Sequence, residues 1–482
     1  MEFFFGRERE KKQLQELYDS GKAEFMAIYG RRRVGKTFLV SEFFKDKGIY
    51  FEITGSKKAP KSEQISNFYR EFTALFPEEN RGEKPKDWGD ALNRLQLALQ
   101  KLPETQKIVL FFDELPWLAA PRSGFLPALD YFWNRHISRM NNVKLIVCGS
   151  AASWMIRHVV DDKGGLYGRL SAQMRLEPFT LSEVEHLLLA RGVKLDRKQL
   201  ITLYMAIGGI PKYLNFVKPG LSAVQMINEF CFKPQGFLFQ EFPKLFKSLF
   251  DDAHKHVKIV KILAENRYGL SQIEIFEKAE LPTGGHSSSL LEELEESGFI
   301  MSIPAYGKQV KQRRWRLIDE YSYFYLTWIE GIRSSILQRT DSDYWLKCQA
   351  SQSWLTWAGY AFENVCLKYV GKIKEALGIS GVSSVDVQWS FRGDKNADGA
   401  QIDLLIDRAD NCINLCEMRF SNDMYVLTKK DQEALERKER VFRRETQTHK
   451  TIFVTMITPY GVVENEQYSG TVQKQVSMNA FF

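Results

Sequence analysis

The sequence predicts an α/β fold organised around a phosphate-binding loop. The prediction rests on three apolar runs and the residues that follow them, and the runs lie at residues 25–29, 108–112 and 143–150. Continuous apolar runs of this length are typical of parallel strands that are covered on both faces. Residues at the carboxyl ends of such strands face the crevice in which ligands bind.

The first run is followed by the pattern G-x-x-x-x-G-K-[ST] and then by a helical stretch. Glycines at both ends let the backbone turn tightly and bring N–H groups close to phosphate oxygens, while the helix amino terminus favours an anion. A glycine-rich turn with a surface lysine would match the same pattern, but the strand before it and the helix after it favour a phosphate loop. We expect these residues to bind nucleotide: Gly30, Arg31, Arg32, Arg33, Val34, Gly35, Lys36, Thr37 and Phe38.

The second run ends in Asp113-Glu114. Asp113 is predicted to hold Mg²⁺ together with the Thr37 hydroxyl, and Glu114 to activate the attacking water, with Lys36 on the β- and γ-phosphates. A solvated acidic turn is the alternative. The spacing between Lys36 and Asp113 leaves room for another strand, which is the pattern of ATPases that have an additional strand and a catalytic glutamate.

Three further residues have two interpretations each. Ser150 either senses the γ-phosphate or merely closes a strand. Arg169, in a glycine-rich loop at 164–170, either neutralises phosphate charge, in cis or from a neighbouring subunit, or is an ordinary surface arginine. Pro211, after Gly208-Gly209, either lies against adenine or only begins a helix.

Composition limits the class of protein. The chain has 482 residues, too many for one core, and a net charge of +7, which permits an anionic partner without requiring one. Its six cysteines form no C-x-x-C pair, so we expect reduced thiols in a cytoplasmic protein. We expect no signal peptide and no membrane span, because no stretch of about 18 apolar residues occurs.

Several motifs together carry a family resemblance: FFGRERE (4–10), YGRRRVGKT (29–37), LFFDE (110–114), CGSAASWM (148–155), LYGR (166–169) and GGIPKYL (208–214). They resemble the archaeal-type ATPases of the STAND group within the AAA+ relatives. The resemblance covers the first half of the chain. It implies binding of ATP, a helical lid with the Gly-x-Pro element, and a winged helix after the lid.

Residues 253–332 fit this winged helix, with helices around 257–263, 270–276 and 287–297 and a β-wing from 298 to 318. The wing carries the basic residues Lys308, Lys311, Arg313, Arg314 and Arg316. They predict contact with a DNA backbone, or else a solvated hairpin or a latch against the ATPase domain. The acidic third helix argues against reading of the major groove.

The last part of the chain resembles PD-(D/E)XK nucleases. The resemblance rests on a helix Glu at 363, an Asp at 403 on one strand and Glu417-x-Arg419 on the next. It implies that Glu363, Asp403 and Glu417 ligate Mg²⁺ for attack on a phosphodiester, with Asp403, Glu417 and Arg419 as catalytic residues. The usual lysine is Arg419 here, and an arginine cannot shuttle a proton. Cleavage is therefore less expected than DNA binding.

The predicted architecture is a P-loop ATPase core (1–180), a helical lid (181–235), a winged helix (236–332), a connecting helical segment (333–355) and a restriction-endonuclease-like α/β domain (356–482). Two functions compete. One is an Mg²⁺-dependent ATPase coupled to a nucleic-acid-binding, nuclease-like half. The other is a nucleotide-gated switch or scaffold that binds a protein partner and cuts nothing. A homo-oligomer is compatible with both.

Overall fold

The structure is a computed structural model that describes residues 5–80, 82–161, 166, 168–233, 235–250, 252–307, 313–332, 344–393 and 398–482. The chain divides into two compact units, Met1–Pro178 and Phe179–Phe482. Each unit is described by itself. The predicted wing residues Lys308 and Lys311 lie outside the described residues, as do Gly164, Gly165 and Tyr167 of the loop at 164–170.

The first unit is built around a parallel sheet in the order β2-β3-β4-β1-β5. Its elements are α1 (Glu8–Asp19), β1 (Glu24–Tyr29), α2 (Lys36–Phe44), β2 (Ile49–Thr54), α3 (Lys61–Leu75), η1 (Pro77–Glu79), α4 (Trp88–Leu99), β3 (Ile108–Asp113), α5 (Leu115–Leu118), α6 (Phe125–Arg135), η2 (Ile137–Arg139), β4 (Val143–Gly149), α7 (Ala152–Met155), η3 (Ile156–Val160) and β5 (Ala172–Arg175). The expected additional strand is confirmed. In the sequence β2 separates the two motifs, and in the sheet β4 lies between β1 and β3.

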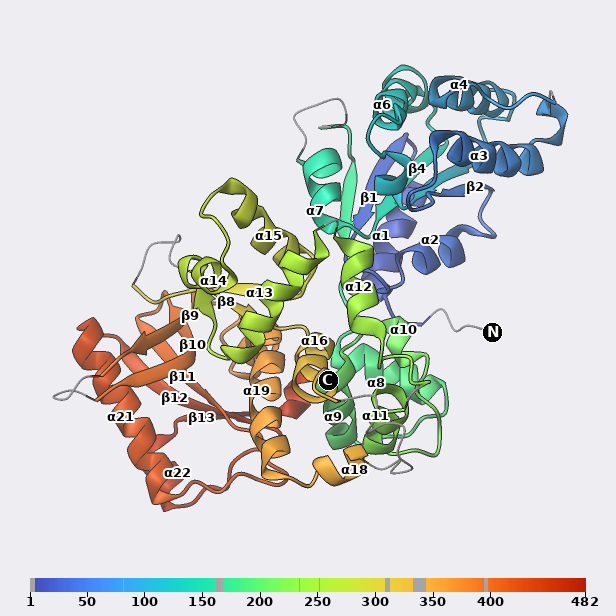
Figure 1. Ribbon diagram of the computed structural model, residues 1–482. Coiled ribbons are helices and arrows are strands. Elements are labelled where there is room, and N and C mark those ends of the chain that lie inside the picture. The colour runs from blue at the N-terminus through green and yellow to red at the C-terminus, as the bar shows by residue number, and fades with distance from the viewer. Residues whose placement is uncertain are drawn as a thin grey trace. The chain divides into compact units, whose positions relative to one another are not determined.

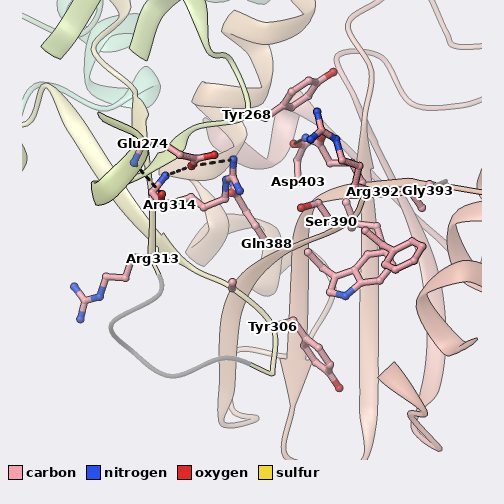
Figure 2. A pocket seen from close by; sticks show the side chains of 18 of the residues that line it. Tyr268, Glu274, Tyr306, Arg313, Arg314, Gln388, Ser390, Arg392, Gly393 and Asp403 are labelled. Carbon is pink, nitrogen blue, oxygen red and sulfur yellow. Dashed lines mark hydrogen bonds and ion pairs between the residues drawn. The ribbon is translucent and has the colours of Figure 1, made fainter. Parts of the chain in front are cut away.

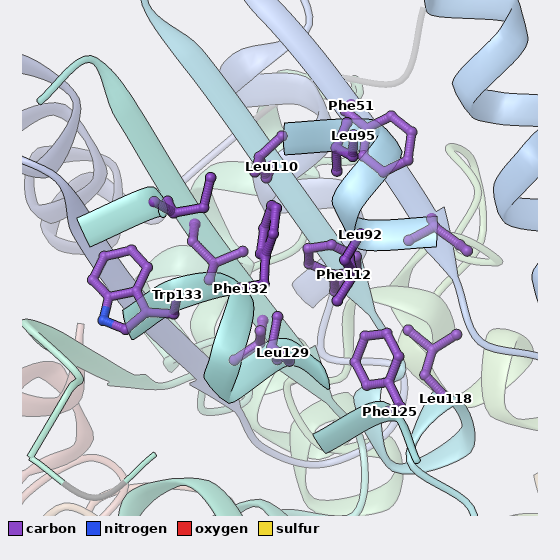
Figure 3. Close-up of a cluster of buried hydrophobic side chains, with 14 of the residues drawn as sticks. Phe51, Leu92, Leu95, Leu110, Phe112, Leu118, Phe125, Leu129, Phe132 and Trp133 are labelled. Carbon is purple, nitrogen blue, oxygen red and sulfur yellow. The ribbon is translucent and has the colours of Figure 1, made fainter. Parts of the chain in front are cut away.

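Helices cover both faces of this sheet. Figure 1 shows α3, α4 and α6 on one face and α1 and α2 on the other. The first face holds an aromatic-rich core in which Phe51, Phe112 and Phe125 are buried with leucines of α4 and α6 (Figure 3). The side chains of β3 and β4 point to both faces of the sheet, and both faces are covered. Every residue of these two strands is therefore buried. A sheet packed on both faces gives rigid support to the loops at its carboxyl edge.

The second unit begins with helices at the position of the predicted lid: α8 (Leu181–Ala190), α9 (Arg197–Ile207), α10 (Pro211–Leu214) and α11 (Ala223–Cys231). The next helix, α12 (Glu241–Leu249), falls in the range predicted for the winged helix. The break between α9 and α10 depends on Gly209, since a Cβ there would lie 1.8 Å from the carbonyl oxygen of Phe179. Pro211 is the first residue of α10. Whether it also contacts adenine stays a prediction.

Next come three helices and a small antiparallel sheet in the order β6-β8-β7. The elements are α13 (Ala253–Glu265), β6 (Leu270–Ser271), α14 (Gln272–Ala279), α15 (Gly285–Glu296), β7 (Ile300–Pro304) and β8 (Arg313–Leu317). The helix expected from residue 270 begins two residues later. Leu270 and Ser271 pair with β8, and the Ser271 side chain caps α14. Assignment of this part to the winged-helix class stays a prediction.

The rest of the unit contains a mixed sheet in the order β13-β12-β11-β10-β9. The elements are α16 (Glu320–Phe324), η4 (Tyr325–Ile329), α18 (Tyr344–Cys348), α19 (Gln352–Lys368), α20 (Val370–Ala376), β9 (Ser384–Phe391), β10 (Ala400–Arg408), β11 (Cys412–Met418), α21 (Lys429–Thr446), β12 (Thr451–Thr458), α22 (Glu466–Thr471), β13 (Lys474–Ser477) and η5 (Met478–Phe481). The register of β9 and β10 shifts between Ile402 and Leu405, beside Asp403. Such irregularities re-aim side chains and are frequent near functional sites.

All six cysteines are free, as expected from their spacing. In the part of the chain that the structure describes, no helix combines the length and the apolar character needed to span a bilayer.

Candidate functional site

The loop between β1 and α2 has the backbone conformation that its glycines predict. Gly30 has φ 144°, and a Cβ there would lie 2.3 Å from the carbonyl oxygen of Leu176. Gly35 has φ 92° and Arg33 has φ 75°, so both adopt backbone conformations that L side chains rarely take. The turn therefore requires glycine at 30 for space and favours it at 35 for conformation. It ends directly at the amino terminus of α2, where backbone N–H groups lack helical partners.

Lys36 is held inside this loop. Its Nζ donates hydrogen bonds to the carbonyl oxygens of Gly30 and Arg31, both at 2.9 Å, and the residue is 5% exposed. Burial lowers the pKa of Lys36, while the carboxylates of Glu114 and Asp113 oppose that shift. A cation fixed in this way is positioned for an anionic ligand before that ligand arrives.

Thr37 and Asp113 meet, as predicted for two groups that share a magnesium ion. The Thr37 hydroxyl donates to Asp113 Oδ2 at 2.8 Å, and Asp113 is 2% exposed. Burial raises the pKa of Asp113, and the hydrogen bond from Thr37 opposes this. The other oxygen, Oδ1, is buried without a hydrogen-bond partner among the described residues. A buried carboxylate oxygen with unused acceptor capacity beside a hydroxyl fits a hard cation such as Mg²⁺.

Glu114 sits in a strained backbone conformation, φ 49° and ψ 49°, immediately after β3. Its carboxylate is held by Ser150, whose hydroxyl donates to Oε1 at 2.6 Å and whose backbone N–H donates to Oε2 at 3.2 Å. Ser150 thus meets the predicted catalytic carboxylate directly, a contact that neither sequence interpretation of Ser150 included. Its predicted contact with the γ-phosphate stays a prediction.

Other residues near the loop were missed or only weakly indicated by the sequence. Arg7 is 5% exposed and donates from Nη2 to the carbonyl oxygen of Val34 at 3.2 Å, so it braces the loop. The guanidinium of Arg32 lies 5.8 Å from the ring centroid of Trp117. Arg169 is exposed, and its role toward phosphate stays a prediction.

In the second unit, Glu363 and Asp403 are brought together around one arginine (Arg316). Arg316 Nη2 lies 2.8 Å from Glu363 Oε2, and Nη1 lies 3.8 Å from Asp403 Oδ1. Nε donates to Asn364 Oδ1 at 2.8 Å, and Arg316 is 2% exposed. The sequence placed Arg316 with the exposed basic residues of the wing. That expectation is wrong for this residue, because its guanidinium is buried against the two carboxylates.

Glu417 is held by other cations. Lys438 Nζ lies 2.6 Å from its Oε2, and Arg419 Nη2 lies 2.7 Å from its Oε1. Among the residues that the structure describes, no three His, Cys, Asp or Glu side chains form a group that could hold a metal ion. The set Glu363, Asp403 and Glu417 therefore stays a prediction without geometric support here. Lys438 lies 21 residues from Glu417 in the sequence, too far for a local motif to indicate it.

Comparisons with known proteins agree with the first part of this description. Residues 4–217 match the family model for an ATPase domain predominantly from Archaea. An uncharacterized protein of Methanocaldococcus jannaschii is 26% identical over 372 residues, which is 76% of this chain and 77% of the relative. An uncharacterized ATP-binding protein of the same organism is 41% identical over 46 residues, which is 10% of this chain and 78% of that protein.

Solved structures with similar folds include a Walker-type ATPase of Pyrococcus abyssi, with 18% identity, a TM-score of 0.46, and coverage of 67% of this chain and 96% of that one. The ORC2 protein of Aeropyrum pernix, in ADPNP and ADP complexes, has 15% identity, a TM-score of 0.42, and coverage of 70% and 95%. The phosphate loop and the acidic end of β3 both lie within residues 4–217, the part of the chain that is similar to an ATPase domain found predominantly in Archaea.

Proposed function

We propose that the protein hydrolyses ATP in a magnesium-dependent reaction at the loop between β1 and α2. The observation that carries this proposal is the meeting of Thr37, Asp113 and the buried Lys36 at the carboxyl edge of one sheet. Lys36 would exchange its bonds to the loop carbonyls for bonds to the β- and γ-phosphates. Backbone N–H groups at the start of α2 would bind the same phosphates.

Mg²⁺ would be held by the Thr37 hydroxyl and the Asp113 carboxylate, and when bound it neutralises charge on the phosphate oxygens. Glu114 would accept the proton of the attacking water. Ser150 positions Glu114, because its two hydrogen bonds fix both carboxylate oxygens. The strained backbone at Glu114 suits a residue whose place is set by function and not by local preference.

The expected result for Glu114→Gln is loss of turnover with retention of nucleotide binding. Glutamine keeps the acceptor for the Ser150 hydroxyl but cannot take a proton, so phosphate release should fall by roughly 10²-fold or more. The measurement is phosphate release beside titration with a fluorescent ATP analogue. The matched control is Glu78→Gln, because Glu78 is an exposed glutamate of η1. This variant should leave turnover and nucleotide binding unchanged. Undiminished turnover in Glu114→Gln would remove Glu114 from the proposed reaction.

For the second unit we propose nucleic-acid binding without cleavage. Arg316 supports the absence of cleavage, because it occupies the space between Glu363 and Asp403 that a metal ion would need. Exposed arginines, Arg313 on β8 and Arg392 after β9, support binding of an anionic polymer. A protein partner with an acidic surface is the competing function.

We therefore expect the full chain with Mg²⁺ to bind DNA or RNA and leave it intact, and the binding to weaken as salt rises. Gel analysis of labelled duplex and single-stranded substrates tests this directly. Magnesium-dependent cleavage that disappears in Asp403→Ala would restore the nuclease interpretation. Absence of salt-dependent binding would favour the protein partner.

A further inference from the structure

A pocket of about 1010 Å³ lies within the second unit, between the α14–β8 region and the β9–β10 edge of the mixed sheet (Figure 2). This volume is at the upper end of the range for small-molecule pockets, roughly 300–1,000 Å³. It therefore has room for more than one nucleotide-sized group. Neither the ATPase reaction nor the family match accounts for it.

The two walls of the pocket are joined by backbone and side-chain contacts. Tyr306 N–H donates to the Gln388 carbonyl oxygen at 2.9 Å, and Ala305 forms a parallel bridge with Gln388. On the other side of the same junction, Arg316 of β8 bonds Glu363 of α19. These contacts tie β7 and β8 to the mixed sheet, so the pocket exists before a ligand binds.

The lining of the pocket favours an anion. It includes the guanidinium groups of Arg313, Arg314 and Arg392. Arg314 is braced by the Gly269 carbonyl oxygen at 3.0 Å and lies 3.8 Å from Glu274, which neutralises one charge. Arg392 is exposed and has no ion-pair partner among the described residues. Asp403 is the second carboxylate in the lining, and its negative charge is offset by an ion pair with Arg316.

The same pocket offers groups that contact bases. Tyr268 lines it and is 45% exposed (Figure 2). Gln388 is 6% exposed, and its Nε2 has no hydrogen-bond partner among the described residues. An aromatic ring beside arginines is the combination that binds single strands, because every base has a face that can stack and every linkage carries a negative charge.

We propose that this pocket binds a single-stranded segment of nucleic acid, with phosphates against Arg392 and Arg313 and a base on the ring of Tyr268. The inference rests on the proposed nucleic-acid binding of the second unit and names its ligand and its site. A duplex is disfavoured, because its paired bases are stacked inside and are read by elements that project into a groove, whereas this site is concave. A protein distinguishes RNA from DNA by the 2′-hydroxyl of RNA, so the binding of both kinds of strand is measured.

The experiment uses the full chain and fluorescence anisotropy with labelled oligothymidylate and oligouridylate of about 12 nucleotides, beside a duplex of equal length. Tyr268→Ala should weaken single-strand binding roughly 5- to 150-fold, and Tyr268→Phe, which keeps the ring, should not. Arg392→Ala should weaken it several-fold and lower the slope of log affinity against log salt by about 0.7. Arg440→Ala, an exposed arginine on α21, is the matched control and should bind as the original chain does.

The outcomes separate the inference from the function on which it rests. Single-strand binding that falls in Tyr268→Ala and Arg392→Ala, at unchanged melting temperature, supports the pocket. If the protein prefers duplex, or if Arg440→Ala and Arg392→Ala weaken single-strand binding equally, the pocket is not the binding site, although the protein still binds nucleic acid. Absence of binding to every probe overturns both.

Discussion

Replacement of Lys36 by alanine is expected to weaken ATP binding and to reduce turnover still further. Lys36 is a buried cation of the loop, and its Nζ contacts two loop carbonyls at 2.9 Å. A hydrogen bond to a charged group contributes about 1.5–3 kcal/mol, so nucleotide affinity should fall roughly 10- to 150-fold. Loss of a charge that stabilises the transferred phosphoryl group should reduce turnover by roughly a further 10²–10³-fold.

Titration with a fluorescent ATP analogue and phosphate release measure the two effects. Lys45→Ala is the matched control, because Lys45 is exposed just after α2 and forms a surface ion pair with Glu42. Lys36→Met is a second variant that keeps the aliphatic stem and thus the packing. If both Lys36 variants fold and bind ATP as tightly as the original chain, the phosphate loop is not the nucleotide site.

Replacement of Arg316 by alanine is expected to cost about 3–5 kcal/mol of the stability of the second unit. The guanidinium bonds Glu363 and Asn364 and is almost fully buried, so its removal leaves a buried carboxylate without a partner. The midpoint of urea unfolding measures the loss. Arg313→Ala, an exposed arginine on the same strand, should change it little. Glu363→Gln added to Arg316→Ala should restore part of the stability, because it removes the unpaired charge.

The effect of Arg316→Ala should also depend on pH. Burial and the neighbouring Asp403 carboxylate, with Arg316 opposing them, raise the pKa of Glu363 to about 7 from an ordinary 4.5. The pKa of Glu363 is higher in the folded state than in the unfolded state. The contribution of Glu363 to the free energy of unfolding is therefore complete below about pH 4.5 and is lost as pH rises through about 7. Without Arg316 the pKa rises further, so the variant should lose more stability at about pH 8 than at about pH 5. Equal losses at both values would show that Glu363 is not the group left unpaired.

The phosphate loop and its sheet could be predicted because their signals are local. An apolar run that is followed by Gly30, Gly35 and Lys36 sets a strand, a turn and a helix through contacts between near neighbours in the chain. Asp113-Glu114 was found in the same way, since the end of a buried strand is visible in its own residues. The meeting of Thr37 with Asp113 then followed from the parallel order of the strands.

The pairing of charges in the second unit depends on contacts between residues that are distant in the sequence. In the sequence Arg316 stands among basic residues of a hairpin and looks like a surface group, but its partners lie 47 and 48 residues further along the chain. Lys438 and Glu417 are separated in a similar way. Alternation along a strand tells which residues share a face and not what packs against that face. Local sequence signals were enough to predict the phosphate loop and the acidic strand end, whereas the ion pairs of the second unit's carboxylates with arginine and lysine depend on the packing of distant elements.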